Sequence, residues 1–267
     1  MMQTAPERLS DTVTTWRDDA VAIVEITRPQ KRNALDDATV LTLESFFSAL
    51  TSEIRAVVLC SEGEHFCAGL DLSQLDERNT FEGVQHSRMW HRALGAIREA
   101  TVPVFAVLKG AVIGGGLELA SSAHVRVAEM STFYALPEGQ HGIFVGGGAS
   151  VRLPRLIGVD RMIDMMLTGR RYDAVTGERI GLSQYVVDDG AGFDTALELA
   201  HSAAKIAPVS TFAVLQALPH IAEAGQREGY LIESLMAGVA QGTDEAKARM
   251  QSFLTRNQRP STNGTPR

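Results

Sequence analysis

Apolar and polar residues follow two different periods along the chain, and the period changes near residue 155. Residues 20–27 alternate and are rich in β-branched side chains, which predicts a strand. Apolar residues at helical spacing predict a helix capped by Asp36 or Asp37, and a second helix over residues 81–99. Further short apolar runs predict strands at 55–60, 103–108, 124–128 and 132–135.

From about residue 155 almost to the end, apolar residues recur at helical spacing. Strands that alternate with helices in the first part favour a sheet covered by helices, so the sequence predicts the α/β class. We expect the mostly helical last third either to cap this sheet or to form an oligomer surface. Glycine or proline is expected to break these helices at Gly169, Gly181, Gly190, Pro208 and Gly242.

The composition is that of a globular protein with an acidic surface. The chain has 267 residues, of which 45% are apolar and 21% charged, enough for one α/β domain with or without a small appendage. Its net charge of −7 repels phosphate groups. We therefore expect neither nucleic acid nor a membrane as a partner.

The cysteine pattern and the N-terminus indicate a cytoplasmic location. Cys60 and Cys67 do not form a C-x-x-C pair, so we expect buried, reduced thiols. The N-terminal residues lack the apolar segment of a signal peptide. The longest apolar runs are too short to cross a bilayer.

Three glycine-bearing loops follow predicted strands, at 66–72, 110–120 and 137–148. Each loop alone is explained equally well by a tight turn. Ligands bind at strand ends in sheets of this class, so three such loops together favour a ligand site lined by backbone.

The middle loop places Gly114, Gly115 and Gly116 at a helix start, where N–H groups and the helix dipole attract negative charge. Neither phosphate-binding fingerprint fits the spacing, which leaves a developing oxyanion on a carbonyl as the candidate ligand. Glu118 follows one turn later and Glu138 lies in the next loop. Taken singly, each suits a helix start or a surface loop, but as a pair they suit general acid–base chemistry.

The histidines and serines indicate neither a metal site nor a serine nucleophile. The seven histidines show no H-E-x-x-H spacing and no cysteine partner, and no G-x-S-x-G motif occurs. We expect His86 and His91 on a helix surface. His141 lies in the third loop and is a candidate ligand contact.

Six motifs resemble those of the enoyl-CoA hydratase/isomerase (crotonase) family, and the resemblance runs from about residue 14 to 257. Each motif is weak alone, but together they are highly specific. They are R-P-Q-K-R-N-A-L at 28–35, F-C-A-G-L-D-L at 66–72, P-V-F-A-V-L-K-G-A-V-I-G-G-G-L-E-L at 103–119, F-Y-A-L-P-E at 133–138, R-L-P-R-L-I-G at 152–158 and L-T-G-R at 167–170.

The resemblance implies a fold, an assembly and a domain organisation. It implies a crotonase-like spiral of ββα units over residues 1–191 that carries the acyl-CoA site. A C-terminal helical trimerisation region over 192–257 and a disordered tail over 258–267 would follow. The implied partners are an acyl-CoA thioester and further copies of the chain, in a homotrimer or a hexamer made of two trimers.

The resemblance also implies a mechanism. The oxyanion hole would be formed by the N–H groups of Ala68 and Gly115, with Glu118 activating water and Glu138 supplying a proton. Members that hydrate enoyl-CoA carry both glutamates, so the resemblance implies an enoyl-CoA hydratase, a carbon–oxygen lyase of fatty acid metabolism that needs no cofactor or metal. The implied substrate contacts are Lys31, Arg32, Ala34, Ala68, Gly69, Leu70, Asp71, Leu72, Gly114, Gly115, His141 and Arg256.

One stretch departs from the family pattern, because His141, Val145 and Ala149 replace leucine, proline and glycine. This loop borders the acyl pocket, so the acyl group stays open. The alternatives are a hydratase of methylthioacryloyl-CoA that then hydrolyses the thioester, an acyl-CoA hydrolase, an enoyl-CoA isomerase, an RNA-binding member and a subunit with an inactive site. The acidic charge and the retention of both glutamates argue against RNA binding.

Overall fold

The computed structural model describes residues 4–71, 73, 79–244, 246–248 and 251. The chain divides into two compact units between Lys205 and Ile206. The boundary predicted at 191/192 is corrected to this position, because helix α7 (Gly192–Ala204) packs on the sheet of the first unit. The tail predicted over 258–267 lies outside the described residues.

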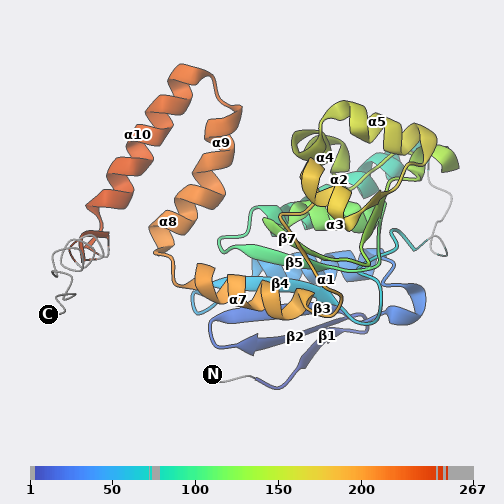
Figure 1. Cartoon of the computed structure of the whole chain (residues 1–267), viewed down its shortest axis with the longest axis horizontal. Helices are drawn as coiled ribbons and strands as arrows, with labels where there is room; N and C mark the ends of the chain where they lie inside the picture. Colours follow the sequence, from blue (N-terminus) through green and yellow to red (C-terminus); the bar gives the residue numbers. More distant parts are fainter. Residues whose placement is uncertain (1–3, 72, 74–78, 245, 249–250, 252–267) are drawn as a thin grey trace, which may run out of the picture. The chain divides into compact units, whose positions relative to one another are not determined.

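A seven-stranded sheet runs through the first unit in the order β1-β2-β3-β4-β5-β7-β10 (Figure 1). The first three strands pair antiparallel, and each strand from β3 to β10 is parallel to its neighbour. The strand bounds are β1 Glu7–Ser10, β2 Val13–Asp18, β3 Val21–Ile26, β4 Ala56–Ser61, β5 Val104–Leu108, β7 Val125–Glu129 and β10 Tyr185–Val187.

A second, three-stranded sheet joins β6 (Ala111–Ile113), β8 (Phe133–Ala135) and β9 (Tyr172–Asp173). An isolated bridge between Cys67 and Val112 ties the loop after β4 to the edge of this sheet. The two loops expected to hold ligand are thereby fixed side by side.

Both faces of the large sheet are covered, which explains why its central strands are apolar on both sides. One set of alternate positions, such as Val57 and Leu59, packs toward helices α1 and α2. The other set, such as Val58 and Cys60, packs against α7. In Figure 1, α7 runs along the sheet on the side away from α2 and α3.

The helices of the first unit begin where the sequence offers caps or glycines. Asp36 caps α1, and its Oδ1 accepts a hydrogen bond of 2.8 Å from the Thr39 N–H. Asn79 and Glu82 form a capping box at the start of α2. The helix bounds are α1 Asp37–Ser48, α2 Thr80–Arg98, α3 Gly115–Ser122, α4 Ala149–Ile157, α5 Val159–Thr168 and α6 Ala174–Ile180, with short 3₁₀ turns at Pro29–Lys31 and Glu138–His141.

The second unit is helical, with α8 (Pro208–Phe212), a π-helical turn (Ala213–Ala217), α9 (Leu218–Glu223) and α10 (Gln226–Gly242). Many of its apolar side chains are exposed. Among these are Phe212, Val214, Leu218, Tyr230, Leu231, Leu235 and Val239.

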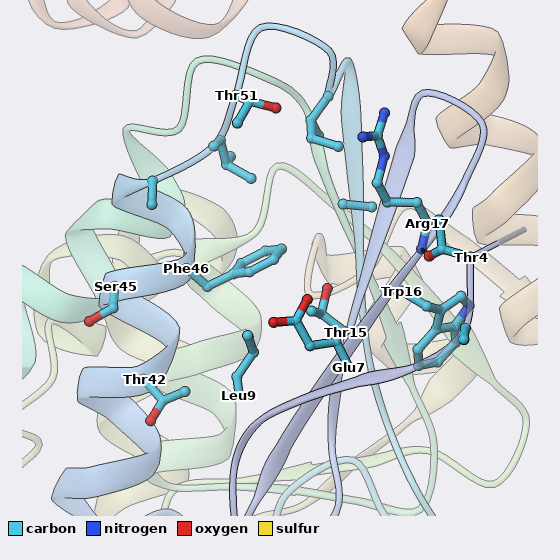
Figure 2. A pocket seen from close by; sticks show the side chains of 15 residues that line it. Thr4, Glu7, Leu9, Thr15, Trp16, Arg17, Thr42, Ser45, Phe46 and Thr51 are labelled. Carbon is cyan, nitrogen blue, oxygen red and sulfur yellow. Dashed lines mark hydrogen bonds between the residues drawn. The ribbon is translucent and has the colours of Figure 1, made fainter.

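A hollow of about 660 Å³ lies between α1 and the β1–β2 hairpin (Figure 2). Its wall mixes threonines with apolar side chains such as Trp16 and Phe46. It contains none of the predicted site residues. The candidate chemistry therefore lies elsewhere.

Candidate active site

A cleft of about 530 Å³ brings the three predicted glycine loops together. Its wall consists of residues from four segments: 68–70, 83–90, 113–118 and 137–147. The three loops predicted to share a ligand site thus line one cleft in the first unit of the chain. Helix α2 supplies the remaining side of the cleft.

Glu118 lies on α3 with only 4% of its surface exposed. Its Oε1 accepts hydrogen bonds from the N–H groups of Gly147, at 2.7 Å, and Ala149, at 3.0 Å. Burial raises the pKa of this carboxyl, while the two N–H donors and the positive charge of Arg152 oppose that rise. The negative charge of the Glu118 carboxylate is therefore partly offset by these N–H groups and by Arg152.

Glu138 opens the 3₁₀ turn after β8 and is 8% exposed. Its Oε2 is buried and accepts no hydrogen bond from any described residue. Burial raises its pKa from the ordinary 4.5 to about 7, and the negative charge of Glu118 contributes to the rise. Near neutral pH, Glu138 can therefore hold or release a proton.

Two glycines make room for these carboxyl groups. Gly114 has a φ of +52°, and a Cβ there would lie 2.7 Å from Glu138 Oε1. A Cβ at Gly147 would lie 2.9 Å from Glu118 Oε2. Side chains at either position would push the carboxyls out of place, so the glycines serve the site as well as the turns.

The Ala68 N–H is not available to a ligand, because it donates to the Arg32 carbonyl at 2.9 Å. The prediction that Ala68 supplies an oxyanion donor is therefore corrected. The motif identified the correct loop, and Ala68 does line the cleft. Its N–H points toward the 28–35 segment instead.

The Leu70 N–H, unlike the Ala68 N–H, points away from the 28–35 segment. Leu35 donates to the Gly69 carbonyl at 2.8 Å, and Asp71 donates to the Leu35 carbonyl at 2.7 Å. In an extended segment the intervening N–H points to the opposite side, here toward Gly115. A Cβ built on Gly115 would lie 3.3 Å from Leu70 N, so the two backbones are in close approach.

Gly115 is the first residue of α3, and its N–H has no acceptor within that helix. Across the described part of the chain, no backbone acceptor takes the N–H of Leu70 or of Gly115. Both residues line the cleft that Glu118 and Glu138 enter. These two donors can share a single carbonyl oxygen.

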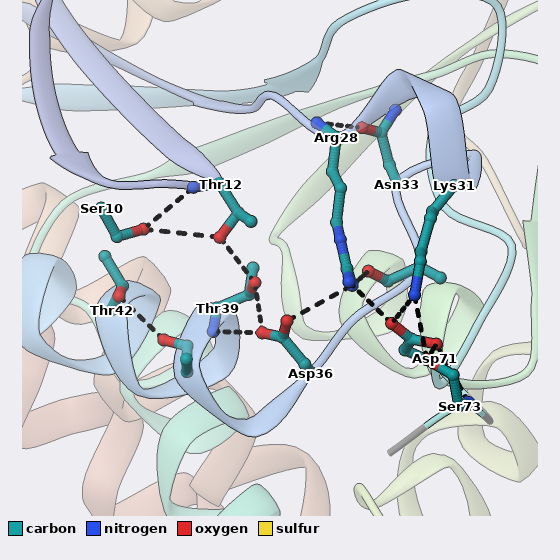
Figure 3. Close-up of polar contacts among 12 residues, drawn as sticks. Ser10, Thr12, Arg28, Lys31, Asn33, Asp36, Thr39, Thr42, Asp71 and Ser73 are labelled. Atoms are coloured by element: carbon teal, nitrogen blue, oxygen red, sulfur yellow. Dashed lines mark hydrogen bonds and ion pairs between the residues drawn. The ribbon is translucent and has the colours of Figure 1, made fainter.

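A charged network lies beside the cleft, around Asp71 (Figure 3). The Asp71 Oδ2 atom pairs with Arg28, at 2.7 Å, and with Lys31 Nζ, at 2.8 Å. The hydrogen bond from Lys31 contributes most to lowering the pKa of Asp71, and the bond from Arg28 adds to it. The network orders the 28–36 segment and leaves Lys31 partly exposed at its rim.

The predicted substrate contacts divide into three groups. Those on the cleft wall are Ala68, Gly69, Leu70, Gly114, Gly115 and His141. Lys31, Arg32, Ala34 and Asp71 lie in or next to the charged network and do not line the cleft. Leu72 and Arg256 lie outside the described residues.

The sequence analysis missed the contribution of α2. His86 was expected on a helix surface, but it lines the cleft together with Ser87 and Trp90. His86 Nε2 lies 2.7 Å from Asp37 Oδ1, and Trp90 Nε1 donates to the same oxygen at 2.9 Å. The spacing of His86 and Trp90 by four residues was the available signal, since it puts both on one helix face.

The described residues hold no group of three histidine, cysteine or acidic side chains placed to share a metal ion. No helix among them is both long enough and apolar enough to cross a membrane.

Comparison with known proteins agrees with this geometry. The model of the enoyl-CoA hydratase/isomerase family matches residues 17–263. The chain belongs to the enoyl-CoA hydratase/isomerase family. The fold is the predicted α/β crotonase spiral, since the chain superposes on the crystal structure of a candidate enoyl-CoA hydratase from Rhodopseudomonas palustris with a TM-score of 0.91. That pair is 55% identical and covers 92% of this chain and 95% of the other.

Two relatives by sequence differ in length. The short-chain-enoyl-CoA hydratase of Clostridium acetobutylicum is 31% identical over 241 residues, which covers 89% of this chain and 92% of that protein. The fatty acid oxidation complex subunit alpha of Shewanella amazonensis is 36% identical over 198 residues, 69% of this chain and only 27% of that protein. The present chain therefore matches only about a quarter of the length of the Shewanella protein.

Proposed function

We propose that the protein is an enoyl-CoA hydratase that adds water across the 2,3 double bond of a 2-enoyl-CoA thioester. The observation that carries this proposal is the placement of two buried carboxyls, Glu118 and Glu138, in one cleft with the free N–H groups of Leu70 and Gly115. Acid–base groups facing a pair of backbone donors suit addition to a conjugated carbonyl.

The donors act on the thioester oxygen. When the Leu70 and Gly115 N–H groups bind that oxygen, they stabilise the enolate-like charge that develops as the nucleophile attacks. Electron density then leaves C3, which becomes the site of attack. The interaction is stronger in the transition state than in the substrate, so it lowers the barrier.

The two glutamates supply and receive the protons. Glu118, whose charge is compensated by two N–H donors, takes a proton from water as the oxygen bonds to C3. Glu138, whose pKa is near 7, gives its proton to C2. The sum is one water added, and proton exchange between the carboxyls through solvent restores the starting state. Because the carboxyls interact, their titration belongs to the pair.

The proposal extends to the CoA moiety and the setting. Lys31, half exposed beside Asp71, is placed to reach a CoA phosphate at the rim. The proton and oxyanion steps use only protein groups, so we propose no cofactor and no metal. A homotrimeric or hexameric assembly in the cytoplasm completes the proposed description.

Glutamine variants test the mechanism directly. Glutamine keeps the shape of glutamate but cannot carry the proton, so Glu118→Gln and Glu138→Gln should each lower hydration by about a hundred- to ten-thousandfold. The double variant should be little worse than the poorer single variant, because the pair acts as a unit. Turnover is read as loss of the conjugated double bond, with substrate binding measured separately.

The same variants separate the alternatives. A 3-enoyl-CoA and a thiol assay are added to the substrate panel. If Glu118→Gln hydrates a 2-enoyl-CoA normally, the two-carboxylate mechanism is wrong. Retained conversion of the 3-enoyl to the 2-enoyl isomer by that variant would favour an isomerase, and release of free CoA thiol would favour a hydrolase.

A further inference from the structure

Helix α2 presents polar groups to a cleft whose other walls are largely apolar. His86, Ser87 and Trp90 lie on the face of α2 that lines the cleft. The Ser87 hydroxyl is already engaged, because it donates to the Gly146 carbonyl at 2.7 Å. Trp90 marks the reacting end, since a Cβ on Gly115 would lie 3.5 Å from its ring.

Asp37 holds His86 in a fixed orientation. Its Oδ1 binds both His86 Nε2 and Trp90 Nε1, so the imidazole and the indole share one anchor on α1. The side chain of His86 is 21% exposed. With Nε2 bound to the carboxylate, the second ring nitrogen, Nδ1, forms no hydrogen bond to any described residue.

An alkyl chain is a poor match for this wall. Apolar side chains such as Leu70, Ile113 and Val145 suit a hydrocarbon chain. A hydrocarbon chain packed over His86 Nδ1, however, would displace the water from that nitrogen without offering a hydrogen bond in exchange. A ligand with a polar group at this point would restore the bond. His86, held through Nε2 and with no partner for Nδ1 among the described residues, therefore favours an acyl group with a polar substituent.

We propose that His86, oriented by Asp37, selects acyl-CoA substrates whose acyl group carries a hydroxyl. This inference rests on the proposed function and names its substrate class. A hydroxyl can donate to a neutral imidazole or accept from a protonated one, so it fits either state of the ring. A carboxylate fits less well, because Asp37 and Glu118 already place negative charge around the cleft.

The test uses matched acyl-CoA thioesters that differ only in the hydroxyl. Saturated pairs cannot be hydrated, so their dissociation constants report recognition alone. The aliphatic pair is 6-hydroxyhexanoyl-CoA and hexanoyl-CoA. The phenolic pair is 3-(4-hydroxyphenyl)propanoyl-CoA and 3-phenylpropanoyl-CoA, and the two arms distinguish an alcohol from a phenol. Calorimetric titration of the full chain is followed by turnover of the corresponding 2-enoyl pairs.

The wild-type protein should bind the hydroxylated member of at least one pair about tenfold more tightly, the factor expected from one satisfied hydrogen bond. His86→Phe keeps a planar ring and should abolish the preference without weakening the unsubstituted ligand. Asp37→Ala removes the shared acceptor, releases the ring and should reduce the preference. His91→Phe, a neighbouring histidine of α2 outside the cleft, is the matched control and should keep it.

Equal binding within both pairs by the wild-type protein would overturn the assignment, as would a preserved preference in folded His86→Phe or Asp37→Ala. Circular dichroism establishes that each variant is folded. Failure of the proposed hydratase is a separate result, because it would appear as absent turnover of every 2-enoyl-CoA. The saturated pairs would still report whether His86 discriminates.

Discussion

Glu118 and Glu138 differ in how the protein compensates their negative charge. Glu118 receives two backbone N–H groups and lies near Arg152, whereas one oxygen of Glu138 is buried with no donor among the described residues. Burial favours the neutral form of both, but the compensation favours the anion of Glu118. This asymmetry is the basis for proposing Glu118 as the base and Glu138 as the acid.

The buried Glu138 carboxylate should lower stability at high pH. Its pKa rises from 4.5 to about 7 on folding, so the folded state binds the proton more tightly and stability falls as pH rises between these values. Each pKa unit corresponds to about 1.4 kcal/mol, so the free energy of unfolding above pH 7 should be lower by on the order of 3 kcal/mol. Glu138→Gln removes the charge and should unfold at higher denaturant concentration than wild type at pH 8.

The same comparison at pH 4 is the control for that stability change. Below both pKa values the wild-type carboxyl is protonated in the folded and unfolded states, so the two proteins should be nearly equal. An equal gain in stability at pH 4 and pH 8 would show that ionisation of Glu138 is not its cause.

Arg152 should position and tune Glu118 without touching substrate. Its guanidinium donates to the backbone carbonyls of Glu118, at 3.0 Å, and Gly147, at 2.7 Å. Its charge lowers the pKa of the Glu118 carboxyl. Arg152→Met should therefore move the acidic limb of the kcat/KM profile to higher pH by about one unit. The pH dependence of 2-enoyl-CoA turnover measures this shift.

Arg152→Lys separates charge from geometry. Lysine retains the positive charge and should restore most of the original pH limb, while losing some rate through poorer alignment of Gly147. A folded Arg152→Met protein with an unmoved acidic limb would rule out a role for Arg152 in setting the ionisation of Glu118.

At this scale the sequence located the two buried carboxyls better than the direction of the backbone N–H groups. The spacing of the carboxyls from the glycines is local. The Ala68 N–H was expected to face the ligand, but the direction of an N–H in this loop depends on the pairing of Leu35 with Leu70, far along the chain. His86 was missed for a similar reason: periodicity shows which residues share a helix face but not what that face meets.

Among the elements, α3 shows most clearly why glycine is required. A Cβ on Gly116 would overlap the Cys67 carbonyl oxygen and come within 2.8 Å of the Cys67 Cβ. Neither group can move easily, because Cys67 is fully buried and its N–H is bonded to the Ala111 carbonyl. The same close approach of α3 to this loop brings the backbones of Leu70 and Gly115 together.

Gly116→Ala should therefore destabilise the protein by about 2 kcal/mol or more and lower turnover, since overpacking at fixed backbone is costly. Gly95→Ala in α2 is the matched control, because nothing lies within 4 Å of the added methyl group. It should stabilise the fold by roughly 0.5–1 kcal/mol through helix propensity. Urea denaturation of both variants measures the contrast, and equal effects would contradict the packing argument.

The sequence predicted some elements and missed others of similar length. The strand expected at 20–27 is β3, and the helix expected at 81–99 is α2, each within a residue or so of its predicted ends. The β1–β2 hairpin went unpredicted, and β9 and β10 lie where only helices were expected. β9 and β10 have two and three residues and are too short to show alternation, so their partners in the sheet define them, whereas β8, which is equally short, was expected at 132–135.

For the whole molecule, the informative feature is the apolar surface of the second unit. Leu231 and Leu235 lie one turn apart on α10 and are 61% and 62% exposed. Phe212 and Leu218, in the same unit, are also more than half exposed. Apolar side chains at this density rarely face water in a monomer, which supports the proposed assembly.

The protein should therefore form a trimer or a hexamer at micromolar concentration, as measured by sedimentation velocity. Leu231→Glu combined with Leu235→Glu would bury two charges in that interface and should shift the protein toward monomer. Ala237→Glu combined with Gln241→Glu adds the same charges at the same spacing on another face of α10 and should leave the assembly intact. A stable wild-type monomer would contradict the prediction. Equal dissociation by both double variants would instead locate the contact elsewhere on the unit.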